Sequence, residues 1–186
     1  MNLRQNNNSN ITDIGISYVA SSCHYLREID VLYSAGVTDI GLQEIAKGIK
    51  DIQLLGLGGA VKSRNLGTYR AYVSIVTDVG LLALAETCHS LNFLNVRGAT
   101  AATDVGAVAI AKGCAIRSFY TNTSHIVSGF FSIQNLRFET DATILALAQR
   151  PMQNIGIYGN SKITSSAVQK LVDISPGLLV SEHRDR

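Results

Sequence analysis

The sequence predicts an α/β fold in which stacked repeat units place short parallel strands on one side and helices on the other. Three observations predict it. A Thr-Asp motif recurs along the chain, apolar residues follow each copy at helical spacing, and a short alternating apolar segment follows each expected helix. No single unit of this kind can bury its own apolar side, so the units must stack around one continuous core, as a solenoid.

Each copy of the motif is Thr-Asp or a close variant, and its acidic position serves as an anchor for counting. The anchors are Asp13, Asp39, Asp78, Asp104, Asp141 and, in the weakest copy, Ser165. They are separated by 26, 39, 26, 37 and 24 residues, so a unit of about 26 residues is lengthened twice. Six units are therefore expected at 11–175, after a polar N-terminal cap segment at 1–10 and before a C-terminal strand and tail at 176–186.

A helix is expected after each anchor. Apolar residues stand three, six and seven positions after it, and in the third unit these are Leu81, Leu84 and Ala85. Such offsets lie on one side of a helix with 3.6 residues per turn. The Thr-Asp pair supplies an N-cap oxygen for the first turn, and an acid there suits the helix dipole.

A short strand is expected after each helix, because an apolar-x-apolar step such as Leu94-Asn95-Val96 follows it. Alternation over so few residues indicates a strand with one buried side. Stacking brings these strands into one parallel sheet, about 4.8 Å apart.

Composition limits the classes of function. The chain has 186 residues, 46% of them hydrophobic, and 16 basic against 14 acidic residues give a net charge of +2. We therefore expect no nucleic-acid partner held by bulk positive charge. No apolar run reaches about 18 residues and no apolar signal segment stands at the start, so we expect no membrane association and no secretion. An odd number of cysteines, three, suits the reducing cytoplasm and indicates an intracellular protein.

The pattern Cys-x-x-Leu-x-x-Leu-x-Val, then Thr-Asp-x-Gly, then x-Ala-x-x-Cys resembles the cysteine-containing subfamily of leucine-rich repeats. Thr77 to Cys114 is its clearest stretch, and the resemblance covers 11–175. That family is best known from the repeat domains of F-box substrate receptors of ubiquitin ligases and of mitotic-exit regulators. The resemblance implies a horseshoe with a concave parallel sheet, convex helices and a protein-binding role. No F-box fits before Ile11, so a substrate-recognition role in a ubiquitin ligase is less favoured.

The cysteines share one column of the repeat, ten residues after the anchor. Cys23, Cys88 and Cys114 are therefore expected to be small buried core residues. Ile49 occupies the same column, which argues against a ligand or a nucleophile there. Cys88 and Cys114 belong to neighbouring units, so a disulfide between them stays conceivable.

No enzyme motif is complete. The Cys-His pairs at 23–24 and 88–89 lack the ligand spacing of a zinc site, and their histidines are expected in solvated turns. The glycine-rich segment 56–63 lacks the glycine before lysine that a phosphate loop requires. We therefore expect a non-enzymatic protein with no catalytic residue, no metal and no cofactor.

Both long intervals place their extra residues between a strand and the next helix, at about 58–75 and 122–138. Insertions at one topological point of a solenoid emerge on one edge, here two units or about 10 Å apart. We expect them to clamp a protein or peptide, because they carry residue types that are common in interface cores. The clamp residues are Arg64, Tyr69, Arg70, Tyr72, Phe130, Phe131 and Arg137. Alternatively the insertions fold back onto the edge, or 129–138 forms a short additional unit.

The outward side of the sheet is the second predicted contact surface, with solvated side chains. Its residues are Asp30, Tyr33, Phe93, Asn95, Arg97, Tyr120 and Tyr158. Two other functions stay open. A self-associating module would form a homodimer through its terminal strands or through apolar helix shoulders such as Leu82 and Val108. An enzyme would need polar groups that converge between the insertions.

Overall fold

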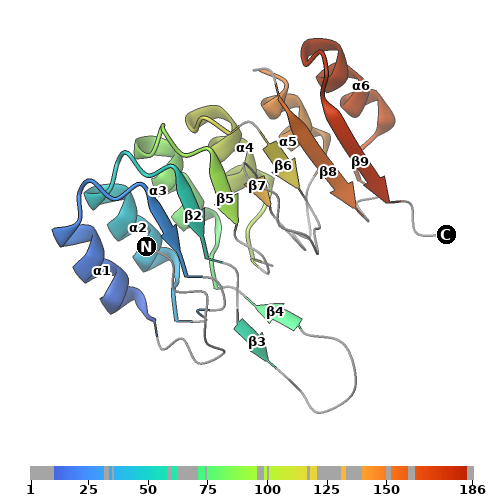
Figure 1. The fold of residues 1–186 in the computed structure, drawn as a ribbon. Helices are drawn as coiled ribbons and strands as arrows, with labels where there is room; N and C mark the ends of the chain where they lie inside the picture. Colours follow the sequence, from blue (N-terminus) through green and yellow to red (C-terminus); the bar gives the residue numbers. More distant parts are fainter. Residues whose placement is uncertain are drawn as a thin grey trace.

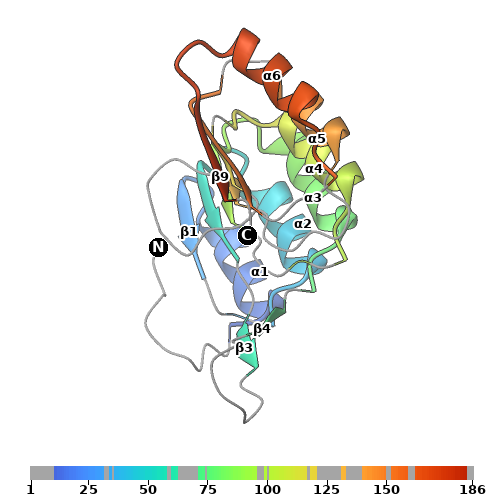
Figure 2. The same ribbon diagram turned by 90° about the vertical axis from the view of Figure 1, so that its right-hand side faces the viewer.

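The structure, a computed structural model, describes residues 11–31, 34, 36–57, 60–62, 71–73, 75–95, 99, 101–116, 118–120, 131–132, 140–149, 152–158 and 162–183. Within these residues it contains six helices and a parallel sheet, so the fold is mixed α/β, as the sequence predicts. The strands form one layer and the helices stack side by side in a second layer (Figure 1). A view from the end of the stack shows the two layers apart (Figure 2).

Each helix in the described part of the chain begins at a predicted anchor. The helices are α1 (Asp13–Ser22), α2 (Asp39–Gly48), α3 (Asp78–Thr87), α4 (Asp104–Gly113), α5 (Asp141–Leu147) and α6 (Ser165–Ile174). Consecutive helices pack against one another from α1 to α6. The helical spacing and the Thr-Asp motif therefore determine where the helices start.

The main sheet contains β1 (Glu28–Asp30), β2 (Leu54–Gly56), β5 (Phe93–Asn95), β7 (Phe131–Ser132), β6 (Ser118–Tyr120), β8 (Asn154–Tyr158) and β9 (Leu179–His183), in that spatial order. All neighbouring pairs are parallel. Strand β7 lies between β5 and β6 although it follows β6 in the chain. Phe131, expected in a clamp loop, is therefore in the sheet, where it pairs with Leu94 and Phe119. The segment expected as the second insertion thus contributes a strand, as the alternative of an additional unit anticipates.

A separate hairpin falls within the first insertion. Strands β3 (Ala60–Lys62) and β4 (Ala71–Val73) pair antiparallel, with Val61 opposite Tyr72. The hairpin projects beyond the edge of the main sheet at which the strands end (Figure 1). Tyr72, a predicted clamp residue, therefore lies in a strand of this hairpin.

The core lies between the two layers. Ile29, Leu55 and Leu94 stand in one register row of neighbouring strands and are fully buried. Leu81 and Leu84, three and six residues after the anchor of α3, are also fully buried and belong to the same cluster. Each such side chain contributes about 1.5–3 kcal/mol on burial. Stability therefore comes from the contact between units, which buries these side chains.

A ladder of hydrogen bonds joins the helix starts. The threonine before the anchor caps its own helix in α2 to α5, as expected, and Thr77 Oγ1 accepts from the N–H of Val79 at 3.1 Å. The anchor carboxylate instead reaches the following unit. Asp39 Oδ1 accepts from the N–H groups of Thr77 and Gly80 at 2.8 and 3.0 Å, and Asp39 Oδ2 accepts from the Thr77 hydroxyl at 2.6 Å. Each aspartate therefore stabilises the start of the next helix.

The same three bonds run from Asp13 to the start of α2 and from Asp78 to the start of α4. They require a glycine two residues after each anchor. A Cβ on Gly41, Gly80 or Gly106 would lie 2.6 Å from the Oδ1 atom of the preceding anchor. The glycine of the motif therefore allows the carboxylate to approach the backbone.

The last two links of the ladder differ. Thr143 replaces the glycine in α5, and its hydroxyl donates to Asp104 Oδ1 at 2.7 Å from a fully buried position. Asp141 accepts from the N–H and the hydroxyl of Thr164, both at 2.7 Å. These two bonds hold the pKa of Asp141 below its usual value.

Candidate functional site

The outward side of the sheet is less open than the sequence predicts. Asp30, Phe93 and Asn95 alternate with the buried Ile29 and Leu94, which places all three on the side away from the core. Asp30 and Phe93 are nevertheless buried, with 4% and 8% exposed, so the expectation of solvated side chains is wrong at these two positions. Asn95 is half-buried.

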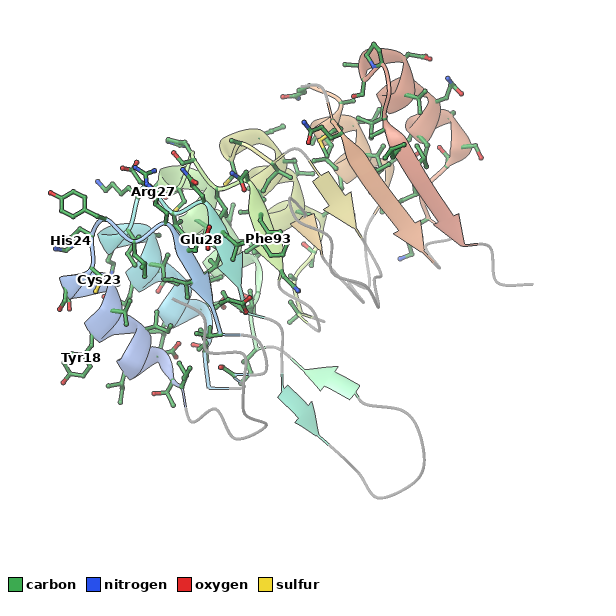
Figure 3. All side chains as sticks on the ribbon, in the orientation of Figure 1. Tyr18, Cys23, His24, Arg27, Glu28 and Phe93 are labelled. Carbon is green, nitrogen blue, oxygen red and sulfur yellow. The ribbon has the colours of Figure 1, made fainter. Side chains whose placement is uncertain are left out.

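The register explains part of this burial. Leu54 pairs with Glu28 on one side and with Phe93 on the other, so their outward side chains stand in one row. Neighbours in such a row are about 4.8 Å apart, and a phenyl ring therefore lies against the adjacent side chains. Figure 3 shows Glu28 and Phe93 on the same part of the sheet. Asp30 and Phe93 each have a further interaction partner, which is consistent with their burial.

Most of the other predicted contact residues are not described by the structure. Tyr120 and Tyr158 are placed by their backbone in β6 and β8, as Tyr72 and Phe131 are in β4 and β7. The remainder fall outside the described residues, namely Tyr33, Arg64, Tyr69, Arg70, Arg97, Phe130 and Arg137. The clamp therefore stays a prediction.

An aliphatic ridge, which we define as Ile14, Ile40, Val79 and Val105, follows the helix starts. Each is the residue directly after an anchor, and between 53% and 69% of each is exposed. Because α1 to α4 pack side by side, these equivalent positions form a row. Ile75, 57% exposed, is bridged to Thr38 beside the row. The ridge therefore exposes apolar side chains at the edge where α1 to α4 begin.

Sequence reasoning missed the ridge although its signal is visible. The motif reads Asp-Ile in the first two units and Asp-Val in the next two. The position after the anchor lies outside the offsets three, six and seven that face the core, so an apolar residue there is not required for packing. Large exposed apolar groups in a row are a feature of interaction surfaces.

A groove of about 560 Å³ lies between α2 and α3 on the helix layer. It exists because Ala46 and Ala83 are small, and Lys47, Lys50 and Glu86 border it. Lys47 is paired with Glu44 at 2.7 Å. The charges around the groove are mixed, so it has no evident preference for anions or cations.

Two of the three cysteines are buried as predicted, and the prediction is wrong for Cys23, which is exposed. The Sγ atoms of Cys88 and Cys114 each lie 4.0 Å from a carbonyl oxygen of the preceding unit, that of Ile49 and that of Leu84. Cys23 belongs to the first described unit, so no described unit precedes it to provide such cover. All three thiols are free, and the conceivable disulfide is not formed. Burial raises the pKa of the Cys88 thiol, while a hydrogen bond with Thr87 acts in the opposite direction.

The two histidines next to cysteines are exposed, as expected, but each contacts the following unit. The Nδ1 atoms of His24 and His89 lie 3.0 and 2.9 Å from the carbonyl oxygens of Gly48 and Gly113, at the ends of α2 and α4. In the described ranges, no group of three or more His, Cys, Asp or Glu residues is arranged to hold a metal ion. These histidines therefore act as links between units.

Among the residues with described structure, no helix combines the length and the apolar character needed to cross a membrane.

Comparisons with known proteins add little to this geometry. No family model matches the chain. The chain has a weak structural likeness, with 14% sequence identity and a TM-score of 0.41, to a chain in the crystal structure of the Rad7 and Elc1 complex in yeast. The likeness covers 92% of this chain and 53% of that chain, so this chain spans about half the length of the protein it matches.

Proposed function

We propose that the chain is a leucine-rich-repeat solenoid that acts as a non-enzymatic binding module for a protein or peptide. The repeated strand–helix units and the aspartate ladder between them support the solenoid. The main support for the binding role comes from the edge of the molecule where the strands end and the helices begin. There the aliphatic ridge is exposed, and the β3–β4 hairpin projects from the same edge.

The ridge offers only part of the energy that a stable complex needs. Full burial of an Ile or Val side chain contributes about 1.5–3 kcal/mol, so four side chains exposed by half to two thirds offer roughly 4–7 kcal/mol. Association costs about 4–15 kcal/mol in lost freedom of motion. The ridge is therefore the apolar centre of a larger contact.

The rest of the contact is assigned to the neighbouring surfaces. The outward side of the sheet carries the exposed Glu28 and the half-buried Leu54 and Asn95. The buried Phe93 pairs with Leu54 and lies in the same strand as Asn95. The two insertions supply the aromatic and arginine residues that the sequence places there, including Tyr69, Arg70 and Phe130. An apolar centre with a polar surround is the usual composition of a protein interface.

A pair of double variants tests this proposal. Ile40→Gln with Val79→Gln removes two ridge side chains without changing the net charge. Lys47→Gln with Glu86→Gln is the matched control, because it also keeps the net charge and changes two exposed residues of the α2–α3 groove. Binding partners captured on the wild-type chain are quantified by mass spectrometry, and the folded state of each variant is checked by its urea midpoint. We expect the ridge variant to lose its partners by about tenfold or more while the control keeps them. Equal capture by all three chains would refute the proposal.

A further inference from the structure

In the part of the chain that the structure describes, the first and last helices of the stack lack a neighbouring helix on opposite sides. We call the side of a helix that faces the preceding unit its front, which holds the residues two, six and ten after the anchor. In α1 these are Gly15, Val19 and Cys23, of which the first and last are exposed and Val19 is half-buried. The equivalent residues of α2 to α4 are all buried, namely Gly41, Ile45, Ile49, Gly80, Leu84, Cys88, Gly106, Ile110 and Cys114. The front of α1 therefore has the form of an interface between units without a described unit on it.

Among the described residues, the opposite side of α6, its rear, is less covered than the rear of the other helices. The residue seven after the anchor is an alanine that is no more than 8% exposed in the first five units, namely Ala20, Ala46, Ala85, Ala111 and Ala148. In α6 it is Val172, which is half-buried. The sheet ends in the same manner, with β1 and β9 as its two edge strands. Leu179 at the start of β9 is 66% exposed.

We propose that the front of α1 is a docking surface for the α6–β9 end of a second copy of this chain, which continues the stack head to tail. The occupant follows from the interface already present between units of the chain. Every other front is covered by a helix that belongs to the preceding strand–helix unit, and a second copy presents such a unit in the same orientation. Strand β9 would then lie beside β1, since Val180 is in register with Ile155 in the row that begins with Ile29.

Ser165 sets how tightly this second copy is held. The N–H groups of Thr12 and Gly15 are equivalent to those of Thr38 and Gly41, which bind the Asp13 carboxylate. Among the described residues no carboxylate reaches Thr12 or Gly15, and a Cβ on Gly15 would meet no atom within 4 Å. The last anchor of the chain is Ser165, whose neutral hydroxyl replaces the aspartate. The contact between copies therefore lacks the charge-assisted bonds that join all the units within one copy.

A head-to-tail contact joins two different surfaces, so each added copy leaves one of each free and association continues beyond a dimer. The resulting chains are open-ended and grow with protein concentration. Ser165 is a neutral and therefore weaker hydrogen-bond acceptor than aspartate, so it limits this growth and leaves surfaces free for a partner.

The test uses the full chain and places an acid at the last anchor. Average mass is measured by light scattering over a concentration series for the wild type, Ser165→Asp and Ser165→Asn. We expect Ser165→Asp to associate at a concentration about tenfold or more below that of the wild type, because charged hydrogen bonds are the stronger ones. Ser165→Asn, which has the shape without the charge, stays close to the wild type.

Two second-site variants identify the surface in the Ser165→Asp background. Gly15→Leu fills the front of α1 where the single chain has open space, so it leaves the fold intact and abolishes association. Ser21→Leu is the matched control on the same helix and leaves association unchanged, since the position eight after the anchor is exposed in the other units as well. In addition, Cys23 should become less reactive toward a thiol reagent as Ser165→Asp assembles, because it lies at the junction.

Three results would overturn the inference. The first is an equal mass for Ser165→Asp and the wild type at every concentration. The second is association that persists with Gly15→Leu. The third is a dimer of fixed size, which would indicate a closed contact between two equivalent surfaces in place of a head-to-tail stack.

Discussion

Replacing Gly80 by alanine tests whether the aspartate ladder governs the packing of neighbouring units. The new Cβ would stand 2.6 Å from Asp39 Oδ1 and 2.8 Å from Leu42 Cδ2, closer than such atoms approach in folded proteins. The Leu42 side chain can rotate away, but the carboxylate is held by its three bonds to Thr77 and Gly80. The substitution therefore forces the carboxylate to leave its position.

The magnitude follows from two opposing effects. Alanine is favoured over glycine inside a helix by about 1 kcal/mol. Loss of the bond from the Gly80 N–H, together with weakening of the other two, costs about 2–4 kcal/mol for hydrogen bonds to a charged acceptor. We therefore expect Gly80→Ala to lower the free energy of unfolding by about 1–3 kcal/mol.

The first unit supplies the control. Gly15 holds the same place in the motif, but a Cβ there meets no atom within 4 Å. Gly15→Ala is therefore expected to raise the free energy of unfolding by a few tenths to about 1 kcal/mol. Urea denaturation of the two variants and the wild type measures both changes. If Gly80→Ala is as stable as Gly15→Ala, the carboxylate is not fixed as described and the reasoning is refuted.

Three further predictions concern single groups. Thr143→Val keeps the shape but removes the hydroxyl that donates to Asp104, and should lower the free energy of unfolding by about 1–3 kcal/mol in urea denaturation. A thiol reagent should label Cys23 in the native chain and the other two cysteines only after unfolding, so two fast-reacting thiols at low protein concentration would contradict the burial described here. Because the pKa of Asp141 is lower in the folded chain than its usual value of 3.8, the ionised carboxylate stabilises the fold at pH values above 3.8. This stabilisation is lost as the pH falls through the pKa of the folded state. The urea midpoint of the wild type should therefore fall more between pH 5 and pH 3 than that of Asp141→Asn.

The helices were predictable because their determinants are local. A Thr-Asp pair and apolar residues at offsets three, six and seven define both the start and the buried side of each helix, and the structure starts α3 at Asp78 and buries Leu81 and Leu84 accordingly. Strand β7 has no comparable local signal. It is two residues long, and its position between β5 and β6 depends on pairing across the sheet that no periodicity reports.

The candidate site was less predictable because exposure depends on neighbours. The column that holds Cys23 and Cys88 indicates one environment, yet the first residue is exposed and the second is buried, since only the second has a described unit before it. Alternation places Asp30 and Phe93 on the outward side but does not reveal that both are covered there. The ridge was not predicted because Ile40 and its equivalents stand one residue after the anchor, outside the offsets that define the buried side of each helix.

The hydrogen bonds of the aspartate ladder lie between consecutive motifs and not within one motif. Each anchor aspartate caps the start of the following helix, so the stabilising contact is a junction formed by an acid from one motif and a threonine and glycine from the next. At the two ends the junction is incomplete. Gly15 retains the glycine of a receiving motif although no described atom needs the space, at a cost of up to about 1 kcal/mol relative to alanine. At the other end, Thr164 before α6 donates to the Asp141 carboxylate, but the anchor position of α6 itself is the neutral Ser165. The first motif therefore has the N–H groups and the space to bind a carboxylate, whereas the last motif has no carboxylate to offer. A single substitution at Gly15 or Ser165 is expected to change how copies associate without disturbing any junction inside the chain.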